Sequence, residues 1–84
     1  RTRFSAHAKA RIEQRGVDLT ADDLARIDDA VDRMAAKGVR DALIYMSQGL
    51  AMVVSVKNRT VITALDDASA KENIFTNIDS AAIL

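Results

Sequence analysis

Residues Leu50 to Leu65, LAMVVSVKNRTVITAL, contain two runs rich in β-branched side chains that meet at Asn58 and Arg59. This pattern is typical of a β-hairpin. A two-residue turn at Asn58-Arg59 predicts the pairs Val56/Val61, Val54/Thr63 and Met52/Leu65 on one face. Arg59 lacks the backbone freedom that the tightest turns need, so a slightly longer loop is an equal alternative. The register is set by whichever element covers the apolar face.

Two helices are predicted before this hairpin. Ser5 is a natural N-cap for a first helix from Ala6 to about Arg15, which Gly16 ends. Thr20 caps a second helix that closes at Lys37-Gly38, with Asp23 placed for a capping box. The second helix carries an apolar stripe at 3-4-3 spacing, made of Leu24, Ile27, Val31 and Met34.

The strands are expected to form an antiparallel meander, because three consecutive runs are joined by short connections. The first strand is Ala42 to Ser47, and the second helix is expected to cover one face of the sheet. Residues 74–78 are interpreted as a fourth strand or an irregular segment. The predicted fold is therefore α+β, with two N-terminal helices followed by a three- to four-stranded antiparallel meander. Residues 1–84 are expected to be one domain, and the start at Arg1 indicates a fragment of a slightly longer protein.

Composition limits the classes of function. The 84 residues include 12 Lys and Arg and 12 Asp and Glu, so the formal net charge is zero. This balance weakens any general attraction to nucleic acid or to anionic membranes. Cysteine is absent, which excludes disulfides, thiol catalysis and thiolate metal sites. No apolar run approaches the roughly 18 residues of a membrane span, and the sequence indicates no cofactor.

Three basic side chains share one edge of the first helix. His7, Arg11 and Arg15 recur at every fourth residue, which is compatible with a grip on an anion or phosphate, with His7 as an acid-base group. A solvated basic edge is the better-supported interpretation, because the sequence shows no second titratable partner. The acidic cluster Asp28, Asp29 and Asp32 is likewise interpreted as a solvated face, since two carboxylates without a ligand-bearing loop make a poor metal site. No catalytic residue and no metal ligand is therefore predicted.

Three blocks of the chain resemble one known family. The blocks are FSAHAKARIEQRGVDLT, VSVKNRTVITALD and KENIFTNIDSAAIL, and together they extend from Phe4 to Leu84. They resemble a small protein encoded in bacterial flagellar operons, usually called the flagellar operon protein, whose genes lie beside those for hook and hook-cap components. The resemblance implies a role in flagellar assembly near hook construction, a cytoplasmic or flagellum-associated location, and no established catalytic residue. The matching residues include Phe4, Ser5, His7, Arg11, Arg15, Gly16, Lys57 to Thr63 and Phe75 to Asp79.

A binding protein of this kind is expected to contact flagellar hook, hook-cap or export proteins. The expected contact surface is the Phe75–Asp79 segment, the apolar tail, or an exposed strand edge that accepts a strand from another chain. Self-association by the same edge would give a symmetric homodimer. The candidate partner-binding residues are Phe75, Asn77, Asp79, Leu84, Asn58 and Arg59.

A second resemblance comes from a different class of protein. The helix SAHAKARIEQRG followed by strands ending in RTVIT is similar to small ribonuclease modules of the RelE and barnase kind. This alternative implies that His7, Arg11, Arg15 and Arg59 meet in one cleft that binds RNA phosphates. A regulator that binds RNA without cleaving it is a third hypothesis. The zero net charge and the scarcity of aromatic side chains count against both.

Overall fold

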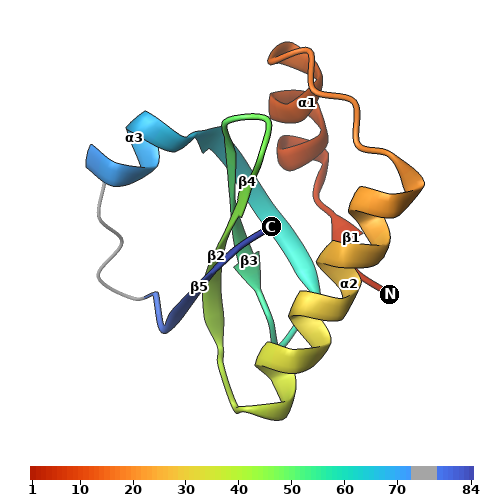
Figure 1. The fold of residues 1–84 in the computed structure, drawn as a ribbon, viewed down its shortest axis with the longest axis vertical. Helices are drawn as coiled ribbons and strands as arrows, with labels where there is room; N and C mark the ends of the chain where they lie inside the picture. The colour runs from red at the N-terminus through yellow and green to blue at the C-terminus, as the bar shows by residue number, and fades with distance from the viewer. Residues whose placement is uncertain (73–77) are drawn as a thin grey trace.

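The computed structural model describes residues 1–72 and 78–84. A mixed sheet of five strands lies between helices α1 and α2 on one side and helix α3 on the other (Figure 1). The predicted α+β class is confirmed, whereas the purely antiparallel sheet is wrong. The elements are β1 (Arg3–Phe4), α1 (Ala6–Gln14), α2 (Ala21–Ala36), β2 (Asp41–Met46), β3 (Leu50–Ser55), β4 (Thr60–Asp66), α3 (Asp67–Glu72) and β5 (Ser80–Ile83).

The strands lie in the order β1-β4-β3-β2-β5. Strands β2, β3 and β4 form the expected antiparallel meander, while β1 pairs in parallel with β4 and β5 pairs in parallel with β2. The two parallel pairs arise because the chain crosses the sheet twice, once through α1 and α2 and once through α3. The strand expected at residues 74–78 lies outside the described residues except for Ile78, and the strand that is found is Ser80–Ile83.

The central hairpin has a longer loop and a different register from the predicted two-residue turn. Ser55 pairs with Thr60, so residues 56–59 form the loop, and Arg59 takes the left-handed conformation with φ of 48°. The pairing also shifts between Val53 and Val54, where the extra residue Ile62 makes a β-bulge. The predicted pairs are therefore replaced by Val54/Val61, Val53/Thr63, Met52/Ala64, Ala51/Leu65 and Leu50/Asp66.

The main core lies between the sheet and the first two helices. Helix α2 buries the predicted stripe at Ile27, Val31 and Met34, but Leu24 is 40% exposed because it lies at the open end of the helix pair. The capping box of Thr20 with Asp23 and the N-cap at Ser5 are both present as predicted. The inner face of the sheet adds fully buried side chains to this core, among them Ile44, Met52, Val54 and Val61.

Candidate functional site

Strand β5 is fixed at both ends against β2. The backbone N–H of Asp79 donates to the carbonyl of Asp41 at 2.8 Å, and Oδ2 of Asp79 accepts from the backbone N–H groups of Arg40 at 2.9 Å and Asp41 at 3.3 Å. At the other end the N–H of Leu84 donates to the carbonyl of Tyr45 at 2.8 Å. Asp79 therefore sets the register of β5, which is a structural role for one of the predicted partner-binding residues.

The two edge regions of the sheet, at β4 and at β5, are covered to different extents by other parts of the chain. On the β4 edge, β1 pairs with the first residues of the strand, and the Ser5 hydroxyl then donates to the carbonyl of Ile62 at 2.7 Å. Further along, Nε of Arg11 donates to the carbonyl of Ala64 at 3.2 Å. Within residues 1–72 and 78–84, β5 has no strand on its outer side. Among the described residues, the β4 edge is therefore covered by β1 and by side-chain donors, whereas β5 is an edge strand with no such cover.

The outer face of the sheet is apolar beside this open edge. Helix α3 covers one end of the face, where Ala70 packs with Ala51 and Leu65. At the β2–β5 end, Ile83 pairs with Tyr45 and is 86% exposed. We call Tyr45, Ala81 and Ile83, together with the free side of β5, the edge surface.

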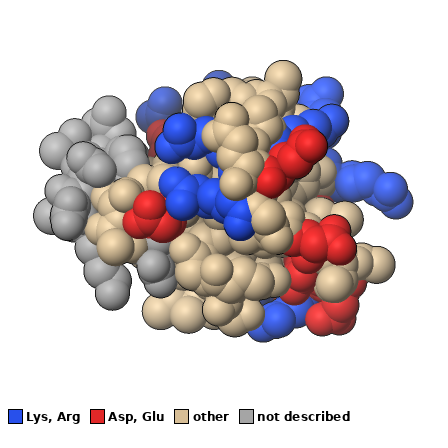
Figure 2. Space-filling model, turned by 90° about the horizontal axis from the view of Figure 1, so that it is seen from above, with Lys and Arg blue, Asp and Glu red and all other residues tan. Residues whose placement is uncertain are grey.

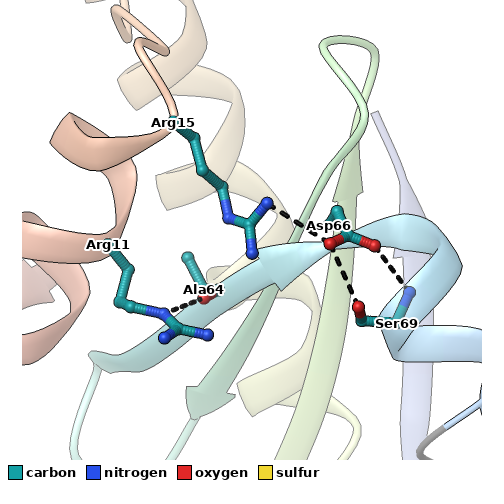
Figure 3. Close-up of polar contacts among 5 residues, drawn as sticks. All are labelled: Arg11, Arg15, Ala64, Asp66 and Ser69. Carbon is teal, nitrogen blue, oxygen red and sulfur yellow. Dashed lines mark hydrogen bonds and ion pairs between the residues drawn. The ribbon is translucent and has the colours of Figure 1, made fainter.

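Arg11 of α1 and Arg15 at its C-terminal end make internal contacts. Arg11 binds the Ala64 carbonyl, and Nη1 of Arg15 lies 3.3 Å from Oδ2 of Asp66, the residue that accepts from Ser69 at the start of α3 (Figure 3). His7 is exposed. On the face of the molecule seen in Figure 2, Lys and Arg lie interspersed with Asp and Glu, so this view shows no field of a single sign.

The proposed ribonuclease cleft is not assembled. Nη1 of Arg59 lies 2.8 Å from Oδ1 of Asp32 on α2, at the start of β4, whereas Arg15 meets Asp66 at the end of that strand. With a rise of about 3.3 Å per residue, the two ends of β4 are roughly 20 Å apart. Arg59 and Arg15 therefore cannot hold one phosphate together.

The hairpin residues Asn58 and Arg59 stabilise the loop. Nδ2 of Asn58 donates to the Ser55 hydroxyl at 3.0 Å, and the Thr60 hydroxyl donates to the Asn58 carbonyl at 2.9 Å. Arg59 links the same loop to α2 through Asp32. Both residues therefore contribute to holding the loop in place.

A hollow lies between α1 and the start of α2. Its volume is about 270 Å³, and Phe4, Ile12, Val17, Leu19 and Leu24 supply its apolar walls. The charged groups at this hollow are Lys9 and Glu13 of α1, four residues apart on one helix face. Among the described residues, the lining of this hollow contains no histidine, serine or threonine.

Two of the predicted partner-binding residues, Phe75 and Asn77, lie outside the described residues. Leu84 is half-buried and packs against the main core, so it is not the exposed end of the tail. Ile83, one residue earlier, is the exposed side chain that was missed. The alternation of a strand would have identified it, because successive side chains of SAAIL point to opposite faces.

In the described part of the chain, no three His, Cys, Asp or Glu side chains come together as metal ligands would. The helices of residues 1–72 and 78–84 are all too short or too polar to cross a bilayer.

The pKa values of Asp66 and Asp23 are lowered in the folded domain, so we expect the domain to lose stability in acid. The backbone N–H of Ser69 is the main cause that lowers the pKa of Asp66, and the backbone N–H of Thr20 does the same for Asp23. A carboxyl with a lowered folded-state pKa contributes its stability above its unfolded pKa, near 4, and loses that contribution as the pH falls through the folded value. Asp66→Asn should therefore unfold at lower urea concentration than the wild type at about pH 7, but lose less stability between about pH 6 and pH 3. Parallel losses in the two proteins would contradict this assignment.

Asp79→Ala tests whether Asp79 serves folding. The change leaves two backbone N–H groups without their carboxylate acceptor, so we expect β5 to open more often. Hydrogen exchange at the Leu84 amide should accelerate by about tenfold, which corresponds to about 1.4 kcal/mol of local stability. Asp29→Ala, which removes only an exposed ion pair with Arg33, is the control. Equal exchange rates in the two variants would show that Asp79 does not hold β5.

The comparisons with known proteins point to one family. A family model described as “Putative flagellar” matches residues 60–83, less than a third of the chain. No curated protein and no solved structure matches the chain. The matched residues include most of the third resembling block and part of the second, whereas the first block lies outside the match. The match covers β4, α3 and the whole of β5, so this part of the chain is similar to a family described as “Putative flagellar”.

Proposed function

We propose that this domain is a non-enzymatic factor for flagellar assembly or its regulation, which works by protein–protein contact close to hook construction. The observation that carries the proposal is the position of the family match. Residues 60–83 contain β4, the crossover through α3, and β5, and this unit supplies most of the edge surface. The candidate partners are hook, hook-cap or export proteins, met in the cytoplasm or at the flagellum.

Contact rather than catalysis is supported by the way the chain uses its polar groups. Arg11, Arg15 and Arg59 each bind an acceptor within the domain, and Arg59 lies far from the other two. Among the large apolar side chains that the structure describes, the most exposed is Ile83, at the edge surface. An apolar side chain held on a rigid strand is suited to bind a partner and has no acid-base chemistry of its own.

A gene-replacement experiment tests the proposal. In a flagellated bacterium that carries this gene, deletion should reduce swimming and the number of completed hooks seen by electron microscopy. Complementation with the wild type or with Ala10→Asp, an exposed change on α1, should restore both. Ile83→Asp should leave the fold intact, because this side chain is 86% exposed, but it should fail to complement, because it places a charge on the edge surface. Normal hooks and normal swimming in the deletion strain would refute the flagellar role.

A further inference from the structure

The open edge of the sheet has the properties of a pairing strand. In a β-strand, backbone N–H and C=O groups point alternately to the two sides, so pairing with β2 uses only half of those on β5. Natural edge strands are commonly protected by lysine, proline or a covering element. Strand β5, with the sequence SAAI, contains neither proline nor a charged side chain. The nearest charge is Asp79, which is already bonded to Arg40 and Asp41.

The sequence of β5 suits antiparallel pairing with a second copy of the same strand. In an antiparallel pair, directly opposite residues lie on the same face of the sheet. Ala81 and Ile83 lie on the outer face, and Ala82 and Leu84 pack toward the core. When SAAIL is read against itself with Ala82 opposite Ala82, Ala81 falls opposite Ile83 and Ser80 falls opposite Leu84. Every large side chain then meets a small one on the correct face.

We propose that β5 pairs antiparallel with β5 of a second copy of this chain, around a twofold axis at Ala82. The two sheets become one continuous sheet, and the two outer faces lie on the same side of it. The interface is isologous, since Ile83 of each copy packs on Ala81 of the other. The paired strands are short, so the dimer forms in a concentration-dependent manner. Self-pairing occupies the free side of β5, so a flagellar partner would meet the outer face of the dimer at Tyr45. The self-association itself does not depend on the flagellar role.

A matched pair of charge variants tests both the interface and its register. Ala81→Lys/Ile83→Lys places like charges opposite each other twice in the proposed register, whereas Ala81→Lys/Ile83→Glu places opposite charges there. Sedimentation of the purified proteins over a range of concentrations should show a concentration-dependent dimer for the wild type. We expect the first variant to weaken dimerisation by roughly tenfold or more, and the second to recover most of the loss. Circular dichroism should show that both variants are folded.

Disulfide cross-linking gives an independent test of the position of the twofold axis. The chain contains no cysteine, so a single introduced cysteine can form a disulfide only with another copy. Ala82→Cys should form a covalent dimer under mild oxidation much faster than Ala10→Cys on the exposed side of α1, because residue 82 lies opposite itself. A chain that stays monomeric at every concentration overturns the proposal. So does a dimer that is unaffected by Ala81→Lys/Ile83→Lys, or one that cross-links equally at both positions.

Discussion

Replacing Ile27 by alanine is expected to lower the free energy of unfolding by about 2–5 kcal/mol. Ile27 is fully buried at the centre of the α2 stripe, and its removal leaves a cavity between the helix and the sheet. A domain of this size has a total stability of only about 4–12 kcal/mol, so the variant should be partly unfolded in moderate urea. Equilibrium urea unfolding measures the change directly.

Leu24→Ala is the matched control, because it makes the same kind of truncation one turn earlier on the same helix. Leu24 is 40% exposed, and its loss should cost clearly less than the loss of Ile27. Equal losses for the two variants would mean that α2 does not pack on the sheet through the face described above.

Ser5→Ala should give the next largest loss, about 1–2 kcal/mol. The Ser5 hydroxyl accepts from the backbone N–H of Ala8 at 3.0 Å, which caps α1, and donates to the carbonyl of Ile62 at 2.7 Å, which closes the edge of β4 at its bulge. Alanine removes both bonds at once. Ser47→Ala, whose hydroxyl contacts only the exposed Gln48, should be nearly neutral in the same urea experiment. A loss that is no larger for Ser5 than for Ser47 would contradict the double role.

The helices were the most predictable part of the fold, because their signals are local. Ser5 and Thr20 stand directly before the helices that they cap, and the spacing of Ile27, Val31 and Met34 identifies the buried face of α2. Such signals need only a few neighbouring residues and the geometry of one helix.

The sheet was less predictable, because its pairing depends on distant parts of the chain. The bulge at Ile62 keeps Val61 and Ala64 both on the inner face, and neither residue reveals this without the partner strand β3. Strand β5 was missed as a strand because three of its four residues, Ser80, Ala81 and Ala82, are small and carry a weak strand signal. Its place beside β2 is fixed by the hydrogen bonds that Asp79 and Leu84 make with residues at the two ends of β2.

The candidate site was predicted in part. The exposed strand edge and the apolar tail were both expected, but the side chain that projects is Ile83, and Leu84 turns toward the core. Asp79, Asn58 and Arg59 were candidates for partner contact and have structural roles in the fold. A resemblance marks positions that matter, and only the contacts show whether a residue holds the fold together or faces a partner.

Site-specific photo-cross-linking in cells tests directly whether the edge surface contacts a flagellar protein. A photoreactive residue placed at Tyr45 on the edge surface, or at Ala10 as the control, is activated while the bacterium assembles flagella, and the linked protein is identified by mass spectrometry. We expect a hook, hook-cap or export protein linked at position 45 and absent at position 10. The same flagellar protein at both positions, or none at position 45, would contradict it.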